Sequence, residues 1–184
     1  MLNTFMVYVE NKPGVLSRVS SLFRRRAFNI DSLTVGRTEK PEVSRMTITV
    51  DVEPSTRTQV IKQMSKLVNV LQATDVTDGP AVNRELLLIR VKTTQVNRTA
   101  VLKEAEIFHA RVVDSTTEGF CLEATGDPEK LDEFVDVMRG YGEIEVTRSG
   151  MVAMSLDNKK LRLSPPVPLG ASTEEALELS EPRA

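Results

Sequence analysis

The sequence predicts an α+β protein made of two ferredoxin-like domains in tandem, each with the element order βαββαβ. Three observations lead to this fold class. Segments with the two-residue period of strands alternate with segments that have a helical period. The order of these segments repeats once along the chain, and Asp78-Gly79-Pro80 interrupts the chain between the two copies. We therefore predict one domain over residues 1–78 and a second over residues 82–157.

In the first half, strands are expected over residues 2–9, 29–37 and 70–76, with another strand after the turn at 38–42. A helix begins near Pro13, since proline suits a first helical turn. Its apolar face consists of Val15, Leu16, Val19, Leu22 and Phe23. A second helix follows Pro54, with Ser55 as its expected N-cap. Its apolar positions are Val60, Ile61, Met64, Leu67 and Val68.

The second half repeats this order. Strands are expected over residues 85–92, 110–115, 120–125 and 144–148. The helix over residues 95–108 is expected to bury Val101, Leu102 and Ala105. Asp127-Pro128-Glu129 is a strong helix start, and the expected buried stripe of that helix is Leu131, Phe134, Val135 and Met138. Residues 158–184 form a Pro-rich, acidic tail that is expected to be mobile.

Composition limits the class of protein. The 184 residues carry a formal net charge of −2, so no general positive field attracts nucleic acid or anionic lipid. No apolar run reaches the roughly 20 residues of a membrane span, and the N-terminus does not resemble a signal peptide. The single cysteine, Cys121, excludes an intrachain disulfide and fits a reducing compartment. We expect a soluble, cytoplasmic protein that binds neither nucleic acid nor membrane.

Residues for catalysis or metal binding are not apparent. One histidine, His109, and one cysteine cannot form a His/Cys metal cluster. No arrangement of serine, histidine and aspartate and no Gly-rich phosphate loop can be identified. We therefore predict no catalytic residue, no metal site and no cofactor in this chain.

A binding motif stands out at Asn11-Lys12-Pro13-Gly14-Val15-Leu16, together with Asn29-Ile30 at the start of the next strand. Free backbone N–H groups at a helix start attract a carboxylate, and a glycine there allows close approach of a ligand. The two asparagine side chains offer groups for the ammonium and carboxylate of an amino acid. Leu16, Ile30, Leu33 and Val35 would form its apolar walls. The site would lie between two copies of the chain; alternatively, Asn11 and Gly14 only cap the helix.

The motif over residues 11–16 resembles the signature of ACT domains, which bind amino acids. With residues 22–35, 44–48 and 66–71, the chain resembles the small regulatory subunits of acetohydroxyacid synthase, also called acetolactate synthase. Residues 84–86, 106–114 and 148–150 extend the resemblance, which covers roughly residues 2–156. Two positions depart from the family pattern: Ala27 replaces a frequent glycine, and the usual Arg-Gly pair after Gly150 is missing.

The resemblance implies a non-catalytic subunit in branched-chain amino acid biosynthesis, with the first domain an ACT domain. It implies binding and activation of a catalytic large subunit that carries thiamine diphosphate, Mg and FAD. It also implies homodimerisation through ACT domains and feedback inhibition by valine bound at the dimer interface. The implied valine contacts are Asn11, Gly14 and Asn29, with Pro13, Val15, Leu16 and Ile30 nearby.

Other functions remain as alternatives. The chain could be an ACT-type regulator without an acetolactate synthase partner. An RNA-binding module on the same fold is disfavoured by the 4 % aromatic content and the absence of tryptophan. A small hydrolase resembling acylphosphatases would need an activated nucleophile or base beside the anion-binding loop, and the sequence places none there.

Overall fold

The computed structural model describes residues 2–157, and the predicted tail over residues 158–184 lies outside the described residues. The described residues form two compact units. Residues 2–82 and 153–157 form the first unit, and Asn83–Val152 form the second. Residues 153–157, assigned to the second domain from the sequence, therefore group with the first unit.

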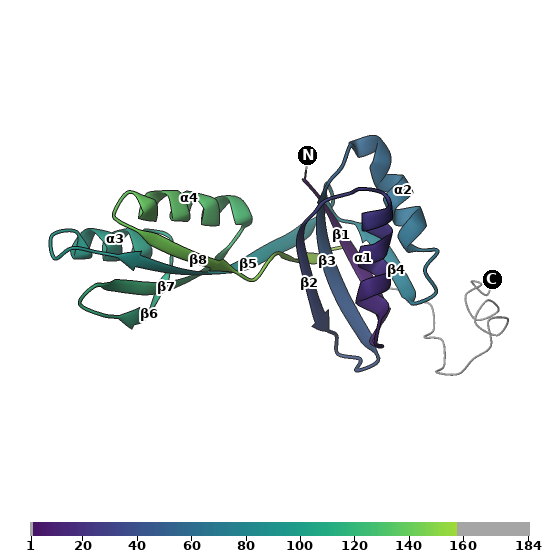
Figure 1. Cartoon of the computed structure of the whole chain (residues 1–184), viewed down its shortest axis with the longest axis horizontal. Helices are drawn as coiled ribbons and strands as arrows, with labels where there is room; N and C mark the ends of the chain where they lie inside the picture. The colour runs from purple at the N-terminus through teal and green to yellow at the C-terminus, as the bar shows by residue number, and fades with distance from the viewer. Residues whose placement is uncertain (1, 158–184) are drawn as a thin grey trace. The chain divides into compact units, whose positions relative to one another are not determined.

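The first unit has the predicted order of elements. They are β1 (Leu2–Glu10), α1 (Val15–Arg25), β2 (Ile30–Arg37), β3 (Val43–Asp51), α2 (Pro54–Met64) and β4 (Val70–Asp75). The strands form an antiparallel sheet in the order β2-β3-β1-β4, and Figure 1 shows α1 and α2 beside it.

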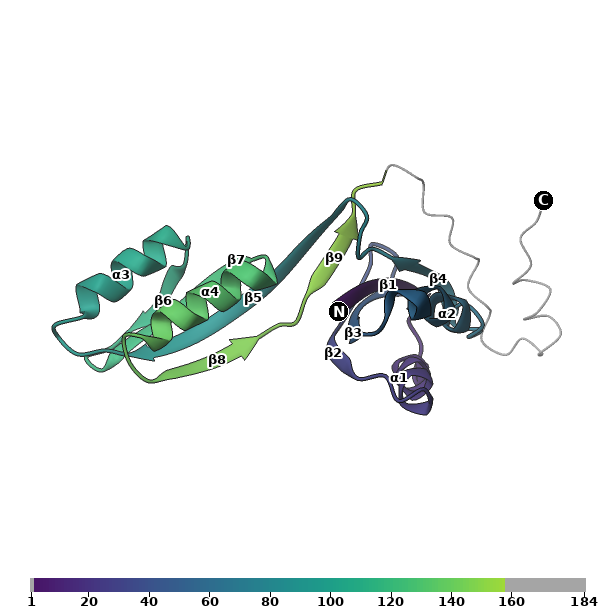
Figure 2. The same cartoon turned by 90° about the horizontal axis from the view of Figure 1, so that it is seen from above.

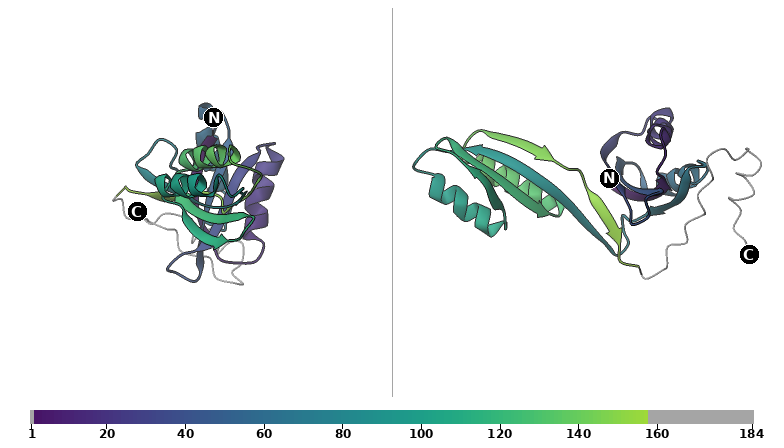
Figure 3. Two further views of the ribbon diagram at one scale, coloured as in Figure 1. Left: turned by 90° about the vertical axis from the view of Figure 1, so that its left-hand side faces the viewer. Right: turned by 90° about the horizontal axis from the view of Figure 1, so that it is seen from below.

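The second unit repeats this topology. Its elements are β5 (Ala81–Lys92), α3 (Arg98–Ile107), β6 (Arg111–Ser115), β7 (Gly119–Gly126), α4 (Pro128–Arg139) and β8 (Ile144–Arg148). The order β6-β7-β5-β8 matches that of the first sheet, and α3 and α4 lie on the same side of it (Figure 3). The predicted α+β fold with two tandem βαββαβ units is confirmed.

Each unit has a core between its two helices and one face of its sheet. In the first unit the largest side chains of this core are Phe5, Phe23, Met46, Ile48 and Met64. In the second unit they are Leu87, Ile89, Leu122, Phe134 and Met138. Apolar side chains of the strands and the helices thus provide the main stabilisation of both units, because their burial removes apolar surface from water.

Three apolar residues predicted on helix faces are exposed, and a fourth packs on the core from outside its helix. Leu16 is 43 % exposed, because it lies about 100° around α1 from the buried Val15. Leu102 is exposed for the same reason beside the buried Val101. The α2 helix ends at Met64, so Val68 lies beyond it and is exposed, and Leu67 packs on the core from a turn.

The predicted cap of α2 is also wrong. The N-cap is Glu53, not Ser55, because Pro54 already occupies the first helical position. The fixed φ of proline suits that position, so the helix begins two residues earlier than a cap at Ser55 would allow.

A strand that the sequence analysis did not predict follows the second unit. Strand β9 (Val152–Ser155) pairs with β5, as Figure 2 shows. Within the first unit, Ala153 packs on the sheet face opposite the helices, in a second cluster with Met6, Tyr8 and Leu71. The backbone N–H of Ala153 donates to Thr47 Oγ1 at 3.2 Å. Four residues are too few for a recognisable period, which is why this strand was missed.

No helix among the described residues is both long and apolar enough to cross a membrane.

Candidate functional site

The loop between β1 and α1 is fixed by Asn11. Its side-chain Nδ2 donates to the carbonyl oxygen of Pro41 at 2.9 Å, and its backbone N–H donates to the carbonyl of Glu42 at 2.7 Å. These bonds attach the loop to the turn between β2 and β3. Asn11 therefore has a structural role, while its exposed Oδ1 can still accept a hydrogen bond.

The start of α1 is open. Gly14 is the N-cap, with φ of 82° in the left-handed region, and no side chain caps the helix. A Cβ at Gly14 would meet nothing within 4 Å, so the space in front of the helix is free. The first turn contains no acidic residue. Its N–H groups and the positive end of the helix dipole can therefore attract an external anion.

The side chains predicted to contact a ligand at the start of α1 differ in their exposure to solvent. Val15 is only 4 % exposed and belongs to the core, so only its backbone is available to a ligand. Pro13 and Leu16 are exposed on either side of it. A ligand at the helix start would meet the Leu16 side chain and backbone groups.

Asn29 and Ile30 lie at the other end of α1. The helix has 11 residues and is therefore about 16 Å long. Asn29 is exposed, whereas Ile30 is half-buried and packs against the core. Within one copy the two predicted parts of the site are thus separated by the length of the helix.

The turn before Asn29 explains a departure from the family pattern. Ala27 has φ of 55°, in the left-handed region where glycine is favoured. The N–H of Ala27 donates to Arg24 O and that of Phe28 donates to Phe23 O, both at 3.1 Å. This pair of bonds is a Schellman helix end, which positions Asn29.

A buried acid beneath the loop was missed by sequence reasoning. Glu10 is 1 % exposed; its Oε1 accepts from Lys12 Nζ at 3.1 Å and its Oε2 accepts from Asn69 Nδ2. Asn69 Oδ1 accepts in turn from Arg18 Nη1 at 2.6 Å. The network joins the end of β1 to the start of β4 and to α1. A charged residue ending an otherwise apolar strand was the available signal.

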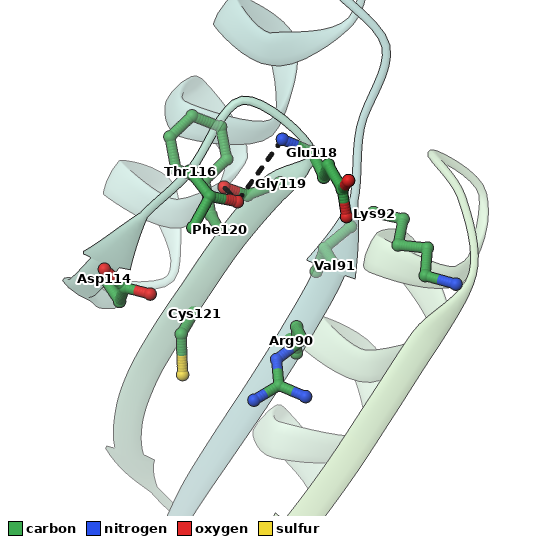
Figure 4. Close-up of a pocket in the computed structure, with 9 residues that line it drawn as sticks. All are labelled: Arg90, Val91, Lys92, Asp114, Thr116, Glu118, Gly119, Phe120 and Cys121. Carbon is green, nitrogen blue, oxygen red and sulfur yellow. Dashed lines mark hydrogen bonds between the residues drawn. The ribbon is translucent and has the colours of Figure 1, made fainter.

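The second unit contains a hollow of about 380 Å³ on its sheet face (Figure 4). It is lined in part by Arg90, Lys92, Asp114 and Cys121, the last being half-buried. Its two cations are already paired: Arg90 with Glu145, and Lys92 with Glu143, each at 2.6 Å.

The ion pair between Lys92 and Glu143 shifts the pKa of both side chains. The hydrogen bond and charge of Glu143 raise the pKa of Lys92, and those of Lys92 lower the pKa of Glu143. Among residues 2–157, no group of three or more His, Cys, Asp or Glu side chains could hold a metal ion. The hollow thus offers two charge pairs and a thiol, and Asp114 is the cross-strand partner of Cys121.

Comparisons with known proteins identify both halves of the chain. Residues 5–72 match the family described as AHAS small subunit-like ACT domain, and residues 84–157 match the family described as small subunit of acetolactate synthase. The two matched regions together cover most of the described residues, and each falls on one half of the repeated topology.

Individual relatives and a solved structure match the chain over most of its length. The chain is 49 % identical over 160 residues to the probable acetolactate synthase small subunit of Archaeoglobus fulgidus, which covers 87 % of this chain and all of that protein. It is 48 % identical over 153 residues to the acetolactate synthase small subunit of Mycolicibacterium smegmatis, covering 83 % and 90 % of the two chains. The crystal structure of the small subunit from Thermotoga maritima has a TM-score of 0.77 at 36 % identity, covering 86 % and 99 %.

Proposed function

This chain belongs to the acetolactate synthase small subunits, a family of regulatory subunits, and we propose that it senses valine for a catalytic partner. In this proposal the chain binds the catalytic large subunit and raises its activity. Valine bound between two ACT domains then inhibits the assembly. The large subunit would carry thiamine diphosphate, Mg and FAD, and this chain would carry no cofactor.

The observation that carries the proposal is the open start of α1. A carboxylate is the ligand group that uncapped N–H groups attract, and Gly14 leaves space for it. The Oδ1 of Asn11 and the side chain of Asn29 offer partners for the ammonium group. Leu16 and Ile30 would contact the aliphatic side chain, and Pro13 and Val15 would contribute backbone.

The separation of the two parts of the site supports a dimer in this proposal. Because Asn11 and Asn29 lie at opposite ends of α1, one ligand cannot reach both in one copy. Strand β2 is an edge strand, which exposes backbone groups able to pair with another strand. Antiparallel pairing of two β2 edges would bring the start of α1 in one copy near Asn29 of its partner.

The test is calorimetric titration of the purified chain with L-valine, alongside inhibition of the reconstituted enzyme. Gly14→Asp should weaken valine binding at least tenfold, because its carboxylate would occupy the positive helix start. Asn29→Ala should weaken binding through the other half of the site. Both variants should still activate the catalytic subunit.

Gly79→Asp is the control for the added charge, since Gly79 also has open space around it but lies in the connection after β4. Of the two glycines only Gly14 has a positive φ, so circular dichroism and activation of the catalytic subunit check that Gly14→Asp still folds. It should leave valine binding and activation unchanged. No heat at millimolar valine, together with unaltered valine sensitivity of the enzyme, would refute the proposal. Valine binding without any effect on the catalytic subunit would instead favour an ACT-type regulator with another partner.

A further inference from the structure

A second hollow lies in the first unit, on the sheet face opposite α1 and α2. Its volume is about 620 Å³. The sheet contributes Tyr8 and Met6 from β1 and Thr74 from β4, and the segment after Ala153 closes one side with Met154 and Asp157. The hollow is therefore separate from the start of α1.

Three polar side chains form a row across the floor of this hollow. Tyr8 is paired with Arg45 of β3 on one side and with Gln72 of β4 on the other. Directly paired residues of antiparallel strands point to the same face, so these side chains share one surface. Next to Arg45 in the row, Gly36 of β2 has nothing within 4 Å of a Cβ position, which leaves the edge of the hollow open.

The charges in the hollow favour an anion. Arg37, Lys40 and Arg45 line it, against the two acids Glu39 and Asp157. Within residues 2–157 the guanidinium groups of Arg37 and Arg45 make no ion pair or side-chain hydrogen bond. Arg45 is half-buried, and a partly desolvated guanidinium without an acceptor is costly.

A neutral polar atom in the same row also lacks a partner. The Oε1 of Gln72 is buried and accepts no hydrogen bond, while its Nε2 makes only a long bond of 3.4 Å to Thr74 Oγ1. Buried polar atoms are normally satisfied, so an unsatisfied acceptor beside two unpaired cations indicates a missing partner.

We propose that this hollow is a second small-molecule site, for a ligand with a carboxylate or phosphate group. The anionic group would accept hydrogen bonds from the guanidinium of Arg45, with Lys40 and Arg37 adding positive charge at the edge of the hollow. A hydroxyl or N–H of the ligand would donate to Gln72 Oε1. The parallel N–H donors of one guanidinium suit both carboxylate and phosphate, so the shared chemistry is an oxyanion.

The experiment uses the full chain at low ionic strength, titrated separately with citrate and with inorganic pyrophosphate. Calorimetry measures affinity, and NMR spectra of ¹⁵N-labelled protein report whether the Gln72 side-chain amide and the Arg45 backbone shift. Binding of citrate alone identifies a carboxylate ligand, and binding of pyrophosphate alone identifies a phosphate ligand. Arg45→Gln should lower the affinity for the bound anion at least tenfold.

Arg24→Gln is the matched control, because it removes the same charge from an exposed position on α1 outside the hollow. It should leave anion affinity within twofold of the wild type. Equal losses in the two arginine variants, or no binding of either anion, would overturn the proposal. Asn29→Ala should not alter anion binding. Failure of the valine site and failure of the anion site can therefore be told apart.

Discussion

The central strands of the two sheets occupy the same place in the same topology but differ in burial. Every residue of β1 from Asn3 to Glu10 is buried, whereas β5 alternates between buried and exposed from Glu85 to Lys92. The difference lies on the sheet face away from the helices. In the first unit that face carries Met6 and Tyr8 and is partly covered by Ala153, whereas in the second it carries exposed residues such as Leu88.

The two loops before α1 and α3 also differ. Neither helix has a side-chain cap, but Asn97 and Arg98 at the start of α3 bond to neighbouring loop residues. Arg98 donates to Thr116 O at 2.7 Å and lies over the ring of Phe120 at 4.2 Å. Asn97 accepts from the N–H of Thr94 at 2.8 Å. The same topology thus carries differently bonded loops at the starts of its two first helices.

The largest expected effect comes from the cover on the first sheet. Ala153→Asp would place a carboxylate at a position that is 1 % exposed, among apolar side chains. Burial of an unpaired charge should lower the free energy of unfolding by at least about 3 kcal/mol. Urea denaturation of the full chain measures this loss.

Val152→Asp is the control for that measurement. Val152 precedes Ala153 in β9 but is 46 % exposed, so a carboxylate there stays hydrated. We expect a change within about 0.5 kcal/mol. Similar small losses in both variants would mean that Ala153 does not cover the sheet in solution.

The sequence predicted the repeated elements well because each carries a clear period. The buried stripe of α4 was read directly from apolar spacing. In β3 the alternation of apolar and polar residues predicts one buried face, and this is wrong, because Thr47 and Thr49 on the other face are buried too. The cover by Ala153 could not be predicted, since it depends on a contact between residues about a hundred positions apart and on a strand of four residues. Local patterns do not encode such a contact.

For the candidate site, the sequence analysis predicted the loop before α1. It did not predict which side chains of that loop are exposed and which serve the core or the loop structure. The positive φ of Gly14 agrees with the turn that the motif indicates. The burial of Val15 and the structural bonds of Asn11 depend on the packing of α1 and on the distant turn at Pro41. The role of the site in valine binding stays a prediction.

A second comparison concerns the last residues of the two central strands. The backbone N–H of Glu10 donates to Asn69 O and that of Lys92 donates to Glu143 O. Each acceptor lies directly before the fourth strand of its sheet, and a side-chain hydrogen bond joins each pair as well. Glu10 is buried, but the Lys92 pair is largely exposed. Glu10→Ala should therefore cost about 2–3 kcal/mol, because it removes a buried carboxylate that accepts from Asn69 and pairs with Lys12.

Lys92→Ala should lower stability much less, because water and salt screen an exposed pair. The raised pKa of Lys92 adds stability below the ordinary pKa of lysine, and this contribution disappears as the pH rises through the folded value. The lowered pKa of Glu143 adds stability that disappears as the pH falls through its folded value. The difference between wild type and Lys92→Ala should thus be constant near neutral pH and shrink at both extremes. If Lys92→Ala lowers the free energy of unfolding as much as Glu10→Ala does, the expected difference between the exposed and the buried pair is wrong.

The smallest expected effect concerns a feature that the two units share. Both α1 and α3 end in a residue other than glycine with φ of 55°, Ala27 in the first and His109 in the second. Left-handed backbone is strained for residues with a Cβ, so Ala27→Gly and His109→Gly should each stabilise the chain by about 0.5–1 kcal/mol. Ala100→Gly, inside α3, should instead destabilise it by about 1 kcal/mol. If all three variants lose stability, the flexibility that glycine gives the unfolded chain outweighs the strain relieved at the helix ends.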